Sequence, residues 1–164
     1  MAQFSFDIVS EYDKAEMNNI FVQSVREIGA RYDFKNTPAG LEWRADKTGF
    51  KITGNSGWQI DAVLDIVRKK LAGRNLSSKV LDLSKPPVES NLKASKEVPF
   101  VTGLDQDKAK EITRLLREKM PKAKAQIQGE AVRVSSGSKN DLQAAMQTVK
   151  SHDFSFPLNF TNFK

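Results

Sequence analysis

The segment AKAQIQGEAVRVS at residues 123–135 decides the fold class of this chain. Small or apolar residues alternate with polar ones on both sides of the pair Gly129-Glu130. Alternation with a period of two is typical of strands that bury one face, and a glycine between two such runs indicates a tight turn. The segment therefore predicts a β-hairpin with one apolar and one polar face.

Helical patterns flank this hairpin on both sides. Apolar residues follow Asp105 at steps of three and four, and Pro121 requires that helix to end by about Lys119. A second helix is expected to begin at Ser138 or Asn140. With a strand at 98–102, where Pro99 favours an edge position, and a last strand at 158–163, the second half has the order βαββαβ.

The first half shows the same order of expected elements. They are a strand at 4–8, a helix from 13 to about 34, a hairpin at 41–52, a helix at 60–71 and a strand at 80–83. The polar residues 84–97 contain Pro86-Pro87 and no periodicity, so we interpret them as a linker.

Two βαββαβ halves predict an α+β protein made of two ferredoxin-like sandwiches. Each would be a four-stranded antiparallel sheet with two helices on one face. The division places the first domain at residues 1–91 and the second at 92–164, with a terminal strand that could be exchanged between them.

The charge distribution indicates an anionic partner for the second half. Residues 1–91 carry 13 basic and 12 acidic side chains, whereas residues 92–164 carry 13 basic and 8 acidic ones, which places +5 of the net +6 in the second half. A basic domain attracts nucleic acid or polyphosphate. Solubility alone is an equally good explanation of such a charge.

The residues that most enzymes and metal sites need are scarce. The chain has no cysteine and one histidine, His152, and its carboxylates are scattered among lysines. No phosphate-binding loop or metal-ligand spacing is present. We therefore expect a non-enzymatic protein without cofactor or metal. A start without signal-peptide features and the lack of a long apolar run predict a cytoplasmic protein that does not enter membranes.

The polar face of the 123–135 hairpin is the leading candidate site. Lys124, Gln126 and Gln128 share it with Arg133, which combines cations for phosphates with amides for base edges. RNA-recognition modules add stacking aromatics to such a face, and Phe160 or Phe163 on the last strand could supply one here. The alternative is that this face packs against the other sandwich.

A second group lies at the end of the first helix. Arg31, Phe34 and Lys35 combine two cations with an aromatic ring and could line a nucleotide-binding groove. Compensation of the dipole at the helix C-terminus explains the two cations equally well.

Four segments resemble the YajQ family: FSFDIVSEYD at 4–13, REIGARYDFK at 26–35, AQIQGEAVRVSSGSKNDLQAAMQTVK at 125–150 and PLNFTNFK at 157–164. The resemblance implies a bacterial protein with two such domains that binds nucleotides without known enzymatic activity. It also implies a cyclic di-GMP effector acting through a protein partner, or an RNA or tRNA binder. Residues 92–104 depart from the family pattern, since they lack its basic strand.

The leading hypothesis is therefore a non-enzymatic nucleotide-binding protein that acts as a cyclic di-GMP effector. An RNA- or tRNA-binding protein that uses a basic sheet face is one alternative. A protein-interaction adaptor is the other.

Overall fold

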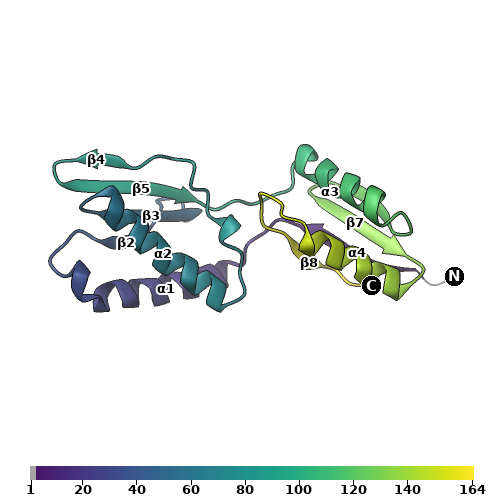
Figure 1. Cartoon of the computed structure of the whole chain (residues 1–164), viewed down its shortest axis with the longest axis horizontal. Helices are drawn as coiled ribbons and strands as arrows, with labels where there is room; N and C mark the ends of the chain where they lie inside the picture. The colour runs from purple at the N-terminus through teal and green to yellow at the C-terminus, as the bar shows by residue number, and fades with distance from the viewer. Residues whose placement is uncertain (1–2) are drawn as a thin grey trace. The chain divides into compact units, whose positions relative to one another are not determined.

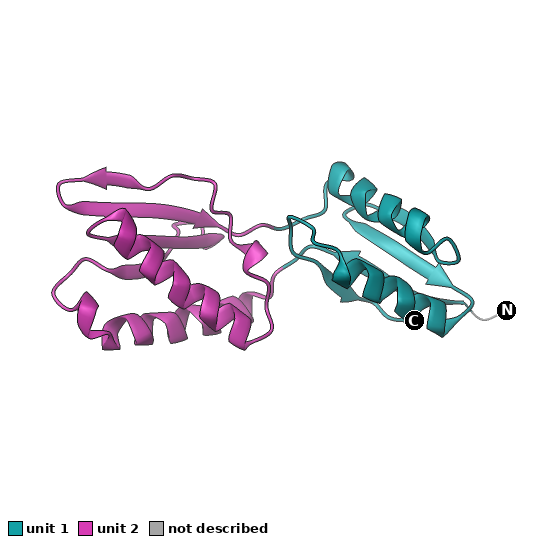
Figure 2. Ribbon diagram, in the orientation of Figure 1, with its two compact units in different colours: residues 1–11, 102–164 teal, residues 12–101 magenta. Residues whose placement is uncertain are grey.

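The computed structural model describes residues 3–164. The chain forms two compact units, which Figure 2 shows in different colours. Unit 1 combines residues 1–11 with residues 102–164, and unit 2 consists of residues 12–101. The N-terminal segment therefore belongs to the same unit as the C-terminal third of the chain.

Unit 1 is a four-stranded antiparallel sheet with two helices on one face (Figure 1). Its elements are β1 (Phe4–Val9), α3 (Gln106–Lys119), β6 (Lys124–Gln128), β7 (Ala131–Ser136), α4 (Lys139–Ser151) and β8 (Asn159–Thr161). The strands lie in the order β6-β7-β1-β8. This is the βαββαβ sandwich that the sequence predicts, with the whole of unit 2 inserted after β1.

The core of unit 1 follows from the alternation in its two central strands. Phe6 faces Val134 and Ile8 faces Val132 across β1 and β7, and all four side chains are completely buried. Gly129 adopts φ of +62° at the hairpin turn, a conformation that glycine reaches without strain. The predicted hairpin is confirmed, and the helices cover its apolar face.

Unit 2 has the same arrangement of strands but a different order along the chain. Its elements are α1 (Lys14–Ala30), the 3₁₀ turn η1 (Tyr32–Phe34), β2 (Gly40–Trp43), β3 (Gly49–Gly54), α2 (Gly57–Gly73), the 3₁₀ turn η2 (Ser78–Val80), β4 (Val88–Ser90) and β5 (Lys93–Pro99). The sheet order is β2-β3-β5-β4. Unit 2 thus forms the same sandwich, but it begins with a helix because its central strand β5 comes last.

The two α+β sandwiches of the predicted fold class are confirmed, whereas the observed units differ from the predicted division at residue 91. The chain passes between the units at residues 11–12 and again at 101–102. The first strand pairs with β7 and β8, where Phe6 and Ile8 are buried. A period of two shows which side chains of a strand are buried, but it does not show which sheet the strand joins.

The interpretation of residues 84–97 as a linker is wrong. They contribute β4 and most of β5, which are joined by a tight turn in which Asn91 and Leu92 have φ of 48° and 65°. All three residues of β4 are exposed, so no apolar alternation marks this strand in the sequence. The Lys96 ammonium also donates to the carbonyls of Leu83 and Lys85.

Two neighbouring predictions are corrected by the same hairpin. Residues 80–83 are not a strand, since only a single bridge joins Leu81 to Phe100 beyond η2. Pro99 does not mark an edge strand, because β5 lies between β3 and β4. Pro99 is the last residue of β5, where a missing N–H interrupts little of the ladder.

The net charges of the two observed units differ from those of the two predicted halves. Unit 1 carries 11 basic and 9 acidic side chains, a net +2, and unit 2 carries 15 basic and 11 acidic ones, a net +4. The predicted excess in the second half is therefore not a property of one folded unit. No helix among the described residues is long and apolar enough to cross a membrane.

Candidate functional site

The face of the unit 1 sheet that points away from α3 and α4 is polar. Alternation and strand register place on it Ser5, Asp7, Val9, Lys124, Gln126, Gln128, Ala131, Arg133, Ser135, Asn159 and Thr161. Four of these are predicted site residues: Lys124, Gln126, Gln128 and Arg133. The register thus brings together two amides and two cations on one open surface.

An ion pair lies at the centre of this face. The Arg133 Nε donates to Asp7 Oδ1 at 2.9 Å and its Nη2 donates to Oδ2 at 3.4 Å, while Asn162 Nδ2 donates to the same Oδ2 at 3.0 Å. Side-chain exposure is 14% for Asp7 and 39% for Arg133. Arg133 is therefore held in one orientation, and its charge is partly neutralised.

The ion pair changes the protonation behaviour of both partners. The hydrogen bond from Arg133 holds the pKa of Asp7 below its ordinary value, against the opposing effect of burial. The Asp7 carboxylate in turn raises the pKa of Arg133. Both groups are charged at neutral pH, so the guanidinium is a permanent donor on this face.

The edge strand β6 supplies the groups that are free to bind. Lys124, Gln126 and Gln128 are all exposed. Within residues 3–164, no side-chain hydrogen bond or ion pair joins any of them to another residue. An amide offers both donors and acceptors, which is what reading the edge of a base requires.

Phe160 does not lie beside these residues as the sequence suggested. It pairs in register with the buried Ile8, so it lies on the side of the sheet that faces the helices. Its ring contacts Phe6 edge-on at a centroid distance of 5.7 Å, and the Lys150 ammonium lies 5.3 Å from its centroid. None of the residues that register assigns to the open face is aromatic.

The second predicted group belongs to unit 2. The Arg31 guanidinium bonds both carboxylate oxygens of Asp33, at 3.0 and 2.6 Å, and lies 4.4 Å from the ring centroid of Phe34. This pairing lowers the pKa of Asp33 and raises that of Arg31. Phe34 is buried in the core, whereas Lys35 is exposed. Only the two cations of this group are therefore accessible to a ligand.

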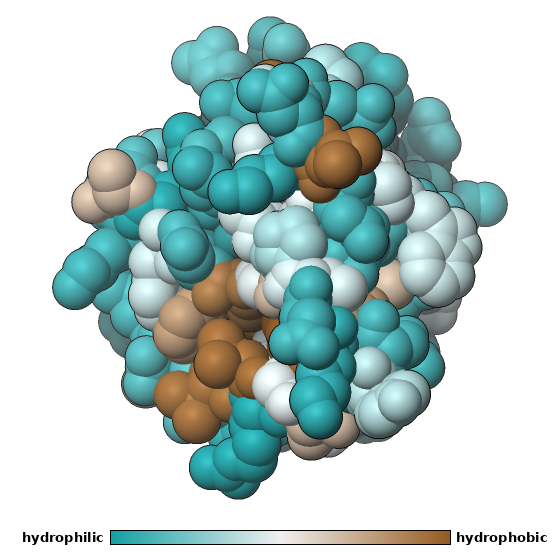
Figure 3. Space-filling model, turned by 90° about the vertical axis from the view of Figure 1, so that its left-hand side faces the viewer, coloured by the Kyte–Doolittle hydropathy of each residue, from teal (hydrophilic) through white to brown (hydrophobic). Residues whose placement is uncertain are grey.

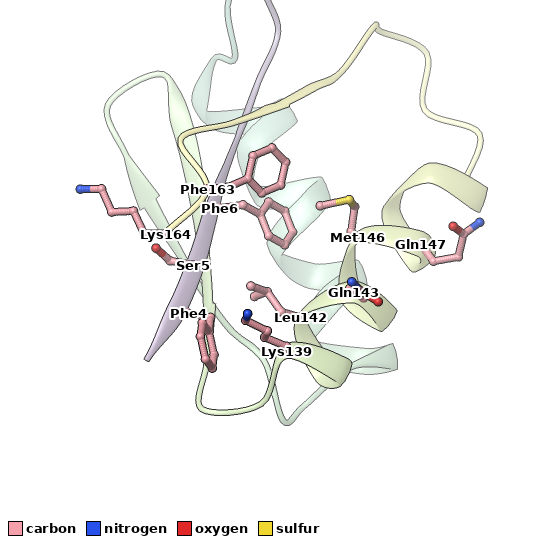
Figure 4. Close-up of a pocket in the computed structure, with 10 residues that line it drawn as sticks. All are labelled: Phe4, Ser5, Phe6, Lys139, Leu142, Gln143, Met146, Gln147, Phe163 and Lys164. Carbon is pink, nitrogen blue, oxygen red and sulfur yellow. The ribbon is translucent and has the colours of Figure 1, made fainter. Parts of the chain in front are cut away.

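A pocket of about 560 Å³ opens on the helix side of β1 in unit 1 (Figure 4). Its lining consists of Phe4, Ser5, Phe6, Lys139, Leu142, Gln143, Met146, Gln147, Phe163 and Lys164. Sequence reasoning missed it because its residues come from three distant segments of the chain. Phe163 was the available signal, but the sequence suggested it only as a stacking residue for the polar face of the hairpin.

The described residues contain no cluster of three or more His, Cys, Asp or Glu side chains that could hold a metal ion. The residues described above for unit 1 offer amides, hydroxyls, cations and aromatic rings to a ligand. Such groups bind and orient a ligand.

Comparisons with known proteins identify relatives that are named as nucleotide-binding proteins. A family model described as "Nucleotide-binding protein YajQ-like" matches residues 4–164. A "Nucleotide-binding protein" of Trichodesmium erythraeum is 43% identical over 98% of this chain and 97% of the relative. Proteins with the same name from a Nocardioides species and from Streptomyces griseus are 41% and 39% identical, each over the full length of both chains.

Proposed function

This chain belongs to the YajQ-like family of nucleotide-binding proteins, and we propose that it binds a nucleotide without catalysing a reaction on it. The observation that carries the proposal is the row across the open face of unit 1, in which Gln126, Arg133 and Asp7 lie in register. Exposed amides lie beside a guanidinium that is already oriented by a carboxylate.

The row suits a guanine nucleotide. Arg133 uses two of its five N–H donors on Asp7, so three are left for a phosphate or for the O6 and N7 acceptors of guanine. Gln126 and Gln128 can reach a base edge, and Lys124 can reach a phosphate. Because the open face has no ring, this surface would bind the edges and phosphates of a nucleotide, not the faces of its bases.

The finer proposal is that the ligand is cyclic di-GMP and that the bound protein acts on a protein partner. A cyclic dinucleotide carries only two phosphates, which a unit with a net charge of +2 can neutralise. Arg31 and Lys35 form a second, separate candidate group of cations within unit 2. Buried Phe34 would hold the Arg31 guanidinium in place through its ring.

Isothermal titration of the full chain with cyclic di-GMP tests this proposal. We expect saturable binding that weakens about tenfold or more in Arg133→Ala, because the variant loses a charged hydrogen-bonding group. Arg68→Ala is the matched control, because Arg68 is an exposed arginine on α2 of unit 2. Absence of saturable binding to cyclic di-GMP, GTP and GMP would overturn the proposal.

RNA binding is a second candidate, favoured by a stripe on α3. Lys110, Arg114 and Arg117 are exposed and spaced by four and three residues, so they lie on one side of the helix. Lysines and arginines in such a stripe can follow a phosphate backbone. Titration with a single-stranded RNA should then show affinity that falls steeply with salt, and a flat salt response would exclude this candidate.

A protein-interaction adaptor is the third candidate, favoured by exposed apolar residues on unit 2. Tyr32, Trp58 and Leu92 are 88%, 73% and 90% exposed. Figure 3 shows one face of the structure, which is mostly hydrophilic but has a group of hydrophobic side chains in its lower part. Binding of a protein partner without any nucleotide binding would favour this candidate over the first.

A further inference from the structure

The walls of the pocket in unit 1 combine apolar side chains from three segments. Phe4 and Phe6 come from β1, Leu142 and Met146 from α4, and Phe163 from the C-terminal segment (Figure 4). Phe6 and Leu142 are buried and form the floor. A volume of about 560 Å³ lies within the range of about 300–1,000 Å³ that small-molecule sites occupy.

The backbone holds Phe163 at the mouth of this pocket. After β8 ends at Thr161, Asn162 adopts φ of 55°, and Lys164 then exchanges two backbone hydrogen bonds with Ser5, at 2.9 and 3.1 Å. These bonds fix the segment on which Phe163 lies. Its position is therefore built into the fold and is not that of a free chain end.

Phe163 has one ring face free. Its ring packs against Phe6 at a centroid distance of 6.1 Å with an interplanar angle of 35°, yet the residue is 61% exposed. Burying an aromatic ring is energetically favourable. The exposed part of the Phe163 ring is therefore a surface that a ligand could cover. A planar group could stack on the exposed face of Phe163 while its edge enters the pocket.

A cation lies at the other end of the pocket. The Lys139 ammonium lies 5.0 Å from the ring centroid of Phe4, and Lys139 is the first residue of α4. No carboxylate within residues 3–164 forms an ion pair with it. The positive end of the helix dipole adds to the attraction for an anion there. Figure 4 shows the Lys164 side chain pointing away from the pocket, so Lys139 is its cation.

We propose that this pocket binds one nucleotide unit, with the base stacked on Phe163 and the phosphate at Lys139. Exposed Gln143, one turn along α4 from Lys139, would contact the edge of the base. The class of ligand rests on the proposed function, but the location does not, because this pocket lies on the opposite side of the sheet from Gln126 and Arg133. The pocket offers an aromatic stacking surface to its own ligand, whereas the open face has no aromatic ring.

The chemistry of the lining selects a nucleotide over its separate parts. A free phosphate would leave the rings of Phe4 and Phe163 unused, and a nucleoside would leave Lys139 without a partner. Stacking and charge act together only on a ligand that carries both a planar ring and an anion. GMP is therefore the probe, and guanosine, inorganic phosphate and decanoate are the comparison ligands.

Titration of the ¹⁵N-labelled full chain followed by NMR tests the location. We expect GMP to shift the amide signals of Gln143, Met146 and Phe163 in a saturable manner, and guanosine and phosphate to bind more weakly. Phe163→Leu and Lys139→Gln should each weaken GMP binding about tenfold. Lys150→Gln is the matched control, because it removes the same charge from the last turn of the same helix and should leave the affinity unchanged.

The possible outcomes separate this inference from the proposed function. If GMP or cyclic di-GMP binds but shifts only signals of β6 and β7, and Phe163→Leu binds normally, the pocket inference fails and the proposed function stands. If decanoate binds in the pocket and GMP does not, the pocket is a site for an aliphatic acid and the inference also fails. If no nucleotide produces a shift, both proposals fail.

Discussion

The two units share one order of strands but use their aromatic residues differently. In unit 2 the rings of Tyr12, Phe21, Trp43, Phe50 and Phe100 form one network with centroid distances of 4.9 to 6.2 Å. The rings come from α1, from the strands β2 and β3 and from the first and last segments of the unit. The five rings pack against one another inside the hydrophobic core or at its edge, so these contacts occupy the faces of the rings.

Unit 1 buries some of its rings, Phe154 and Phe156 among them, but it places two others, Phe4 and Phe163, at the end of a strand and near the end of the chain. Phe4 is the first residue of β1 and Phe163 follows β8, so both lie where the sheet is incomplete. Phe6, whose ring contacts Phe163, is completely buried. The comparison shows that one sandwich architecture can join several aromatic rings of its central strands in a core, as in unit 2, or leave rings near the ends of its strands at a pocket, as Phe4 and Phe163 of unit 1.

The largest expected effect comes from opening the aromatic core of unit 2. Phe50 is 1% exposed, so Phe50→Ala should lower the free energy of unfolding by about 3–5 kcal/mol through lost contacts and a cavity. Urea unfolding followed by tryptophan fluorescence measures this change, because Trp43 and Trp58 both lie in unit 2.

Phe163→Ala in unit 1 is the counterpart of that substitution. Because Phe163 is largely exposed, its loss should change stability by only about 0.5 kcal/mol, the usual limit at exposed positions. Urea unfolding followed by circular dichroism reports on both units. If Phe50→Ala and Phe163→Ala lowered the free energy of unfolding equally, the expected difference between the buried and the exposed ring would be wrong.

An intermediate effect is expected at the ion pair on the open face of unit 1. Asp7→Asn should destabilise the protein by about 1 kcal/mol at pH 7, because it replaces charge-assisted hydrogen bonds to Arg133 with weaker ones. Urea unfolding of both proteins at several pH values measures the difference.

The pH dependence of this effect has a defined sign. The pKa of Asp7 is lowered in the folded protein, so its contribution is fully present above the unfolded value of about 3.9 and is lost as pH falls through the folded value. The difference between wild type and Asp7→Asn should therefore shrink in acid. A difference that is as large at pH 2 as at pH 7 would show that the carboxylate charge is not its cause.

The smallest effect is expected at the corresponding pair in unit 2. Asp33 also pairs with an arginine, Arg31, but the two side chains are 47% and 36% exposed. Solvent screens such a pair, so Asp33→Asn should change the unfolding free energy by less than Asp7→Asn does. A loss larger than that of Asp7→Asn would reverse the ranking of the two ion pairs.

Local patterns allowed much of the fold to be predicted. The hairpin at 123–135 and the helices capped by Asp13, Asp105 and Ser138 follow from periodicity and from side chains that accept hydrogen bonds from backbone N–H groups. Strand β4 was missed because all its residues are exposed, and a strand without a buried face carries no periodic signal.

The candidate site was predicted only in part, for a similar reason. Lys124, Gln126, Gln128 and Arg133 share a face because two adjacent strands with a short turn leave few choices of register. Phe160 was placed on the wrong face because the register of β8 against β1 depends on a pairing across the whole chain. Local alternation carries no information about such a pairing.

The sequence by itself determined most of the elements, their apolar faces and the family of this chain, because these depend on residues close together in the chain or on its whole pattern. Only the tertiary structure decided that β1 joins the C-terminal unit, that Asp7 orients Arg133, and that Phe4, Lys139 and Phe163 surround one pocket. These arrangements join residues up to about 160 positions apart, and they form only when strands pair and helices pack.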